Sequence, residues 1–247
     1  MRTIKGKLIA TISMAAVIIL LAGSIGSYLI ANSVVNKKVK ELQSEKARET
    51  AEEMSGWLSG QIAWVQENAN TYELKMQQES YEEIKEYLAK RLAASGDVIM
   101  DAYYGFEDHT MLIINSEVGS DYDCCERGWY RQAKENGKVV VTDPYMDAFT
   151  GRIVVTIAAP IHNEAGGIVG VCGADIMIEE LVGVLDSLEE EQGGYGFIVD
   201  SAGCFVAHRN EEFLPKGDVP VAISDAAGGV LSDVAALLSE GKGIVLC

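Results

Sequence analysis

The feature that most limits the fold of this chain is a run without a charged side chain from Leu8 to Ala31. As an α-helix these 24 residues would be about 36 Å long, enough to cross a hydrocarbon core of about 30 Å. A cleaved signal peptide is the alternative, because basic residues precede the run. The run is longer than a typical signal sequence, however, and no Ala-x-Ala site closes it. We therefore expect an uncleaved transmembrane helix at 8–31 after a cytoplasmic N-terminus at 1–7.

Charge is distributed unevenly along the chain. Residues 1–40 contain six basic side chains and no acidic one, whereas the whole chain has 20 basic and 37 acidic residues and a net charge of -17. Equal numbers of basic residues flank the run on both sides, so the positive-inside rule does not orient it. We expect a single N-terminal span in the cell membrane, with the acidic remainder extracytoplasmic. So acidic a balance excludes a general nucleic-acid binder, which needs clustered Lys and Arg.

No motif in the sequence predicts catalysis, a metal or a cofactor. The five cysteines form no CxxC pair and the three histidines are isolated, so neither set has the spacing of metal ligands. The chain also lacks a nucleophile elbow, a phosphate-binding glycine loop and a carboxylate pair beside a base. We expect no enzyme, no metal and no cofactor. Two interpretations of the cysteines stay open, namely small buried hydrophobic residues or a disulfide framework; they are Cys124, Cys125, Cys172, Cys204 and Cys247.

Helical periodicity follows the apolar run. From Ala47 to Met76 apolar residues recur every three or four positions, which predicts one face of a long helix that continues out of the membrane. That face has to cover either a sheet of the same chain or a partner helix in a dimer. Ser80 and Glu83 then form a capping-box pattern, which predicts the start of a second helix. We assign residues 32–95 to these two helices.

Strand-forming patterns begin at Val98. The predicted strands are 98–104, 111–114, 138–142, 152–159 and 167–174, the last two as a hairpin, and short helices are expected at 127–136 and from 176 to about 190. Helices followed by antiparallel strands at short spacing predict an α+β domain. We place one unit at 96–190 and a second at 191–247. The second unit begins with a strand, a turn and a strand at 195–208 and looks cut short.

The stretch from Asp121 to Asp175 contains side chains that suit a zwitterion. A guanidinium such as that of Arg127 holds a carboxylate through a planar pair of hydrogen bonds, and the indole N–H of Trp129 is a further donor. Two carboxylates, Asp147 and Asp175, can surround an ammonium group, which donates three hydrogen bonds. Together these side chains would complement both ends of an α-amino acid.

At these residues the sequence resembles the double Cache sensor family of bacterial receptors, best known from methyl-accepting chemotaxis proteins. One amino-acid-binding motif of that family has a tyrosine, then Arg-x-Trp-Tyr, then Tyr-x-Asp, then a later aspartate. The resemblance implies that Arg127 and Trp129 bind the ligand carboxylate and that Asp147 and Asp175 bind its ammonium group; the motif also includes Tyr130 and Tyr145. The first tyrosine is Tyr103 or Tyr104, since strand alternation lets only one face a pocket. We favour Tyr103, which stands two residues before Gly105.

The resemblance implies a PAS-like antiparallel sheet and the extracytoplasmic ligand-binding part of a homodimeric transmembrane chemoreceptor that senses an amino acid or related amine. Two alternatives stay open: the sensor region of a histidine kinase or cyclic-dinucleotide enzyme, and a structural dimerisation module without a ligand. Each site residue also has a simpler interpretation. Arg127 could pair with Glu126 or Asp123, Trp129 and Tyr130 could be core residues, and Asp147 could cap a turn.

Overall fold

The computed structural model describes residues 4–188, 196–200, 202–216 and 219–226. The chain divides into two compact units, the first at residues 1–48 and the second at residues 49–245. The long helix α1 (Ile4–Thr71) contributes to both. In the first unit its large apolar side chains are exposed, for example Leu20 at 70% and Leu29 at 60%. Among the described residues, α1 contains the one window apolar enough to cross a membrane by length and composition, with a mean hydropathy of 2.2 and no buried residue.

In the unit at residues 49–245, helices α1 and α2 (Tyr81–Ala93) cover one face of a central sheet. The C-terminal part of α1 packs against the core through Met54, Leu58, Ile62 and Val65, and a π-helical turn, η1 (Tyr72–Met76), follows it. Helix α2 comes next and begins with the predicted capping box. The Ser80 hydroxyl accepts the Glu83 N–H at 3.3 Å, and the Glu83 carboxylate accepts the Ser80 N–H at 3.0 Å. The expected start of the second helix is confirmed.

An antiparallel sheet forms the centre of this unit. Its strands lie in the order β2-β1-β6-β5-β3, and β4 pairs with β5 beside β3. Their bounds are β1 (Ile99–Phe106), β2 (Met111–Ile113), β3 (Val140–Val141), β4 (Tyr145–Met146), β5 (Ile153–His162) and β6 (Ile168–Met177). The predicted hairpin of the two long strands is confirmed as β5 and β6. The sequence patterns missed β4, which has only two residues.

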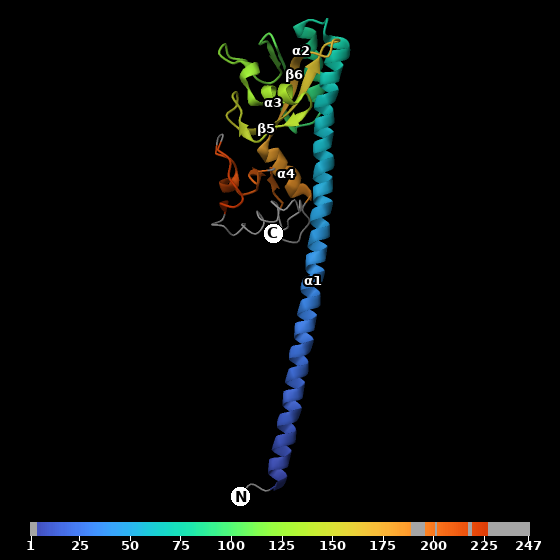
Figure 1. Cartoon of the computed structure of the whole chain (residues 1–247), viewed down its shortest axis with the longest axis vertical. Helices are drawn as coiled ribbons and strands as arrows, with labels where there is room; N and C mark the ends of the chain where they lie inside the picture. Colours follow the sequence, from blue (N-terminus) through green and yellow to red (C-terminus); the bar gives the residue numbers. More distant parts are fainter. Residues whose placement is uncertain (1–3, 189–195, 201, 217–218, 227–247) are drawn as a thin grey trace. The chain divides into compact units, whose positions relative to one another are not determined.

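Side-chain alternation separates two hydrophobic clusters on the two faces of the sheet. Tyr104 faces α1, where its hydroxyl donates to the Asn68 carbonyl at 3.1 Å. Tyr103 faces the other side and packs with Trp129 of α3 (Gly128–Asn136), the helix drawn in green beside β5 and β6 in Figure 1. A 3₁₀ turn, η2 (Cys124–Glu126), precedes α3 and positions its first residues. The predicted α+β class with an antiparallel sheet is confirmed. The structure adds that helices lie on both faces of this sheet.

The structure describes the end of the predicted unit 96–190 and part of the predicted unit 191–247. Helix α4 (Ile178–Leu188) follows β6 directly, two residues later than expected because β6 continues to Met177. Beyond it, β7 (Ile198–Val199) pairs with β8 (Phe205–Ala207), and η3 (Glu211–Phe213) follows. Phe205, Ile223 and Ala226 are buried together there. The two strands of the predicted strand–turn–strand are present as β7 and β8. Its first residue, Ser201 of its turn, the predicted end of the preceding helix and residues 227–247 lie outside the described residues.

Candidate functional site

Asp175 is the centre of a polar group on the sheet face that α3 covers. Its side chain is only 2% exposed. One carboxylate oxygen accepts hydrogen bonds from the Tyr103 hydroxyl at 2.7 Å and from the Thr156 hydroxyl at 2.5 Å. The strand register explains the arrangement, because Thr156 lies opposite Asp175 on β5 and Tyr103 lies opposite Gly173 on β1. Three strands thus bring one acceptor and two donors together.

Gly173 makes room for this contact. A Cβ atom at that position would lie 2.2 Å from Cε2 of Tyr103, far closer than two carbon atoms can approach. The tyrosine ring therefore crosses β6 directly above the glycine and reaches Asp175 two residues further on. Any larger residue at position 173 would displace the ring.

Burial determines the protonation of Asp175. The pKa of the Asp175 carboxyl is raised to about 7, chiefly because burial removes water from around it. The hydrogen bonds from Thr156 and Tyr103 oppose this rise, and the charges of Asp147 and Asp101 add to it. Asp101 is itself buried but fully engaged, because it accepts three backbone N–H groups and the Ser116 hydroxyl. A cation beside Asp175 would favour its charged form.

Tyr145 and Asp147 reach the same face from β4 and the turn after it. The Tyr145 hydroxyl lies 2.6 Å from the Thr156 hydroxyl, which in turn donates to Asp175. Asp147 is 4% exposed. Its Oδ2 atom accepts the backbone N–H groups of Phe149 and Thr150, at 3.1 and 2.6 Å, and the Thr150 hydroxyl. Asp147 therefore does cap the turn, as the simpler interpretation expected, and these bonds leave its Oδ1 atom available.

Trp129 and Arg127 come from the beginning of α3. The Trp129 ring is 2% exposed, and its centroid lies 4.8 Å from that of Tyr103. The indole packs directly on Gly105, where a Cβ would lie 2.9 Å from it. The Arg127 guanidinium carbon lies 5.6 Å from the centroid of the Tyr122 ring. Its Nε atom is buried and has no hydrogen-bond partner within the described part of the chain, so it can donate to a ligand.

Tyr130 belongs to a different network. Its ring is buried beside Trp129, but its hydroxyl donates to Glu107 at 2.5 Å, and Glu107 also pairs with Lys134 at 2.7 Å. Among the predicted site residues, the structure links Tyr103, Tyr145 and Asp175 through hydrogen bonds and brings Trp129 against Tyr103. It does not join the Tyr130 hydroxyl to that set.

Sequence reasoning gave no role to Thr156, Gly173 or Tyr122. Thr156 had a detectable signal, since it is a polar residue within the apolar run of a strand predicted to pair with the one that carries Asp175. Tyr122 had no detectable sequence signal, because it lies in a loop. Burial raises the pKa of Tyr122 to about 12, and the Arg127 charge opposes the shift.

Solved structures of chemoreceptor ligand-binding domains share this fold. The domain of Pseudomonas fluorescens CtaA in complex with L-valine matches with a TM-score of 0.67 at 24% identity, over 77% of this chain and 81% of that one. The domain of Pseudomonas aeruginosa PctB in complex with L-Arg matches with a TM-score of 0.62 at 28% identity, over 73% of each chain.

The family follows from the sequence itself. The model of the dCache_1 family, a Cache domain, matches residues 27–244, so the chain belongs to this family and the resemblance to double Cache sensors is confirmed. The chain is 28% identical over 183 residues to the methyl-accepting chemotaxis protein PctB of P. aeruginosa, which is 74% of this chain and 28% of PctB. It is 32% identical over 133 residues to McpB of Bacillus subtilis, which is 53% of this chain and 19% of McpB. The aligned part is less than a third of either relative.

Proposed function

We propose that this chain is the extracytoplasmic ligand-binding part of a bacterial transmembrane chemoreceptor and that it binds an α-amino acid or related amine at the sheet face under α3. The observation that carries the proposal is the buried Asp175 carboxylate, which is held by Tyr103 and Thr156 on the same face as Trp129 and Tyr145. The solved domains of PctB in complex with L-Arg and L-Gln, each 28% identical to this chain, support the ligand class.

The two ends of such a ligand require opposite charges. An ammonium group has three donors and no acceptor, so it suits the Asp175 carboxylate and the available oxygen of Asp147. A carboxylate suits the guanidinium of Arg127, whose Nε atom is buried without a partner in the described part of the chain. The aromatic rings of Trp129 and Tyr103 exclude water between these ends and strengthen both contacts.

The rest of the chain fits a membrane receptor. We propose a cytoplasmic start at 1–7, a transmembrane helix at 8–31, the helices of the sensor at 32–95, the ligand-binding unit at 96–190 and a membrane-proximal unit at 191–247. The apolar window of α1 and the chemotaxis relatives support this order. We also propose a homodimer and a chemotaxis output, with a histidine kinase or cyclic-dinucleotide enzyme as the alternative output.

The binding proposal is tested by ligand titration of the full chain in lipid nanodiscs. A thermal-shift series of amino acids should raise the unfolding midpoint for at least one of them, because a ligand that binds only the folded state stabilises it. If a folded chain, checked by circular dichroism, shows no shift with any amine-bearing compound, the proposal is wrong.

Two substitutions separate the roles at the site. Asp175→Ala and Arg127→Ala should each weaken amino-acid binding at least roughly thirtyfold, since each leaves a charged ligand group desolvated and unpaired, at a cost of about 2–5 kcal/mol. Arg127→Ala alone should lower the preference for amino acids over the decarboxylated amines. The exposed Asp186 of α4 provides the matched control, Asp186→Ala, which should bind normally. Equal losses for both ligand types in Arg127→Ala would make Arg127 a structural residue.

A further inference from the structure

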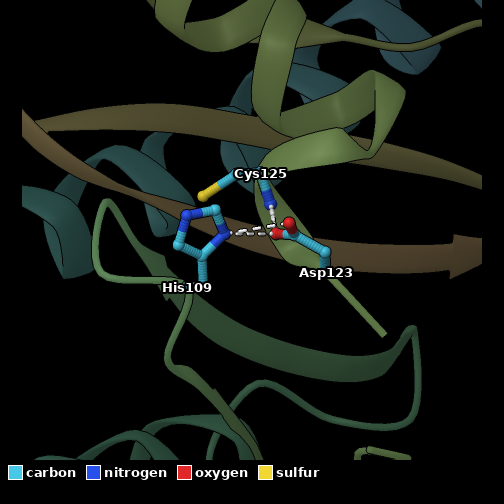
Figure 2. A group of neighbouring side chains, drawn as sticks. All are labelled: His109, Asp123 and Cys125. Atoms are coloured by element: carbon cyan, nitrogen blue, oxygen red, sulfur yellow. Dashed lines mark hydrogen bonds and ion pairs between the residues drawn. The ribbon is translucent and has the colours of Figure 1, made fainter. Parts of the chain in front are cut away.

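Three side chains with different metal-binding atoms meet at one end of the β1–β2 hairpin. His109 lies in the hairpin turn, Asp123 precedes η2, and Cys125 lies within η2. One donor atom from each residue lies within 4.8 Å of the other two. Figure 2 shows the Asp123 carboxylate and the Cys125 thiol both directed at the imidazole of His109. The three residues belong to two separate chain segments and lie outside the amino-acid site.

Asp123 holds the other two residues in place. Its two carboxylate oxygens lie 2.8 and 2.9 Å from Nδ1 of His109, and it also accepts the backbone N–H of Cys125 at 2.9 Å. His109 has a φ of 69°, the one positive value among the described residues other than glycine. The side chain of His109 is 63% exposed, so solutes reach it freely.

The surroundings favour a cation. Besides Asp123, whose carboxylate contacts the ring, Asp108 and Glu107 carry negative charge near His109. A surface hollow of about 580 Å³ adjoins the cluster. Two basic side chains line this hollow, but Lys134 is paired with Glu107 at 2.7 Å and Arg131 with Glu126 at 3.1 Å.

We propose that His109, Asp123 and Cys125 bind one divalent transition-metal ion, with Zn²⁺ the best match. A thiolate, an imidazole and a carboxylate are the ligand types that Zn²⁺ takes, whereas Mg²⁺ and Ca²⁺ prefer oxygen atoms alone. Three protein ligands leave the fourth tetrahedral position for water or a solute. Cys124 is not a ligand, because its side chain is fully buried under Gly105 and Trp129.

Binding requires small movements and the release of protons. Around a tetrahedral Zn²⁺ the donor atoms lie roughly 3.3–3.6 Å apart, so the His109–Asp123 contact must widen and the Cys125 sulfur must approach. The Cys125 thiol, which now donates to the Phe106 carbonyl at 3.2 Å, must give up this hydrogen bond when it loses its proton. Its proton, and any second proton on the imidazole, pass to solvent.

A bound ion would fasten the hairpin turn to η2. Arg127 follows Cys125 by two residues and Trp129 by four, so the ion would restrict the segment that begins α3. Amino-acid affinity should then depend on metal, and by linkage metal affinity on amino acid. This consequence alone rests on the proposed function, whereas metal binding itself does not.

The test is a Co²⁺ titration of the full chain with its thiols kept reduced and no amino acid present. Tetrahedral Co²⁺ bound to a thiolate absorbs through sulfur-to-metal charge transfer and visible d–d bands, so both should appear, saturate at one ion per chain and disappear when Zn²⁺ is added. Cys125→Ser should abolish the charge-transfer band. His109→Gln and Asp123→Asn should each weaken binding by at least about tenfold, the loss seen even for residues that only support metal ligands.

Matched variants distinguish this site from adventitious binding. Cys204→Ser removes a thiol just before β8 and Asp186→Asn an exposed carboxylate of α4, and both should leave the titration unchanged. A folded, reduced chain that gives no charge-transfer band overturns the proposal, as does a band that survives in Cys125→Ser. Either result leaves amino-acid binding by the Asp175 site unaffected, because that titration contains no metal.

Discussion

At the scale of single residues, the buried Asp175 should make amino-acid binding depend on pH. The pKa of Asp175 is about 7, and an ammonium group binds the anion. Affinity should therefore be constant above this pH and fall by up to about tenfold per pH unit below it. Calorimetry between pH 5.5 and 8, in buffers of different ionisation enthalpy, should detect release of a proton near neutrality. Asp175→Asn should bind weakly and show neither effect, and a wild-type affinity that is constant over this range would contradict the prediction.

The same residue affects the stability of the free protein. An ordinary aspartate has a pKa of 3.8, and Asp175 in the folded chain has a pKa of about 7. Between these values the folded state binds the proton that the unfolded state has lost, so stability falls as pH rises through the interval. Above this interval the folded state bears the full free-energy cost of the buried, charged carboxylate, and a bound cation offsets that cost. A ligand should consequently raise the unfolding midpoint more at pH 8 than at pH 5.5.

A glycine substitution tests the path of the Tyr103 ring. Gly173→Ala introduces a Cβ 2.2 Å from the present position of the ring, so the ring has to move away from Asp175. We expect a loss of about 1–3 kcal/mol in stability from overpacking, together with weaker amino-acid binding. Gly183→Ala in α4 is the matched control, because nothing lies within 4 Å of its added methyl group. It should be neutral or stabilising by up to about 1 kcal/mol. Normal binding by Gly173→Ala would show that the ring position does not matter.

At the scale of secondary-structure elements, the capping box of α2 should contribute measurably to stability. Ser80→Ala removes the hydroxyl that accepts the Glu83 N–H and should cost about 1 kcal/mol. Ser59→Ala is the control, because the Ser59 hydroxyl is exposed and, within the described part of the chain, bonds to the carbonyl of the preceding helical turn alone. Urea unfolding of both variants measures the difference. Equal urea midpoints for the two variants would show that the capping box does not stabilise α2.

Local patterns predicted these elements because their signals are local. The period of the apolar residues and the capping residues predicted α2 and the long strands. The alternation of side chains along a strand required Tyr103 and Tyr104 to face opposite sides of the sheet. The structure indeed turns one toward Asp175 and the other toward Asn68. The observed ends of elements differ from the predicted ends where pairing between strands determines them. Strand β6 continues to Met177 because its end pairs with Val154 of β5, and this delays α4.

The remaining features depend on register and packing, which one sequence does not reveal. Strand β4 is two residues long and exists only through its pairing with β5. The space for the Tyr103 ring above Gly173 follows from the β1–β6 register. His109 stands 14 residues before Asp123, a spacing that matches no metal motif. The sequence therefore predicted no metal site, and only the contact between the hairpin turn and η2 brings these ligands together.

At the scale of the whole molecule, α1 continues from the predicted membrane span into the sensor unit. The sequence left open whether its apolar stripe packs against a sheet of the same chain or against a partner helix. From Met54 to Val65 the stripe packs against the chain's own core, which shows the first use for that part. The opposite side of α1 carries the small residues Gly56, Gly60 and Ala63, which are exposed in the single chain. A partner helix would have to approach on that side.

Cysteine cross-linking in membranes tests this dimer. Single cysteines at 51–65 should be introduced after replacement of Cys125, Cys204 and Cys247 by serine, since Cys124 and Cys172 are buried and can stay. A homodimer along α1 should give cross-links that recur with a period near 3.6 residues. Maxima should fall at Gly56, Gly60 and Ala63, where no neighbouring atom obstructs the two glycines. Minima should fall at the core-facing Met54, Leu58 and Ile62. An amino acid should change the pattern only if it binds two helix arrangements unequally. Absence of cross-links at every exposed position would show that this surface of α1 is not a dimer interface.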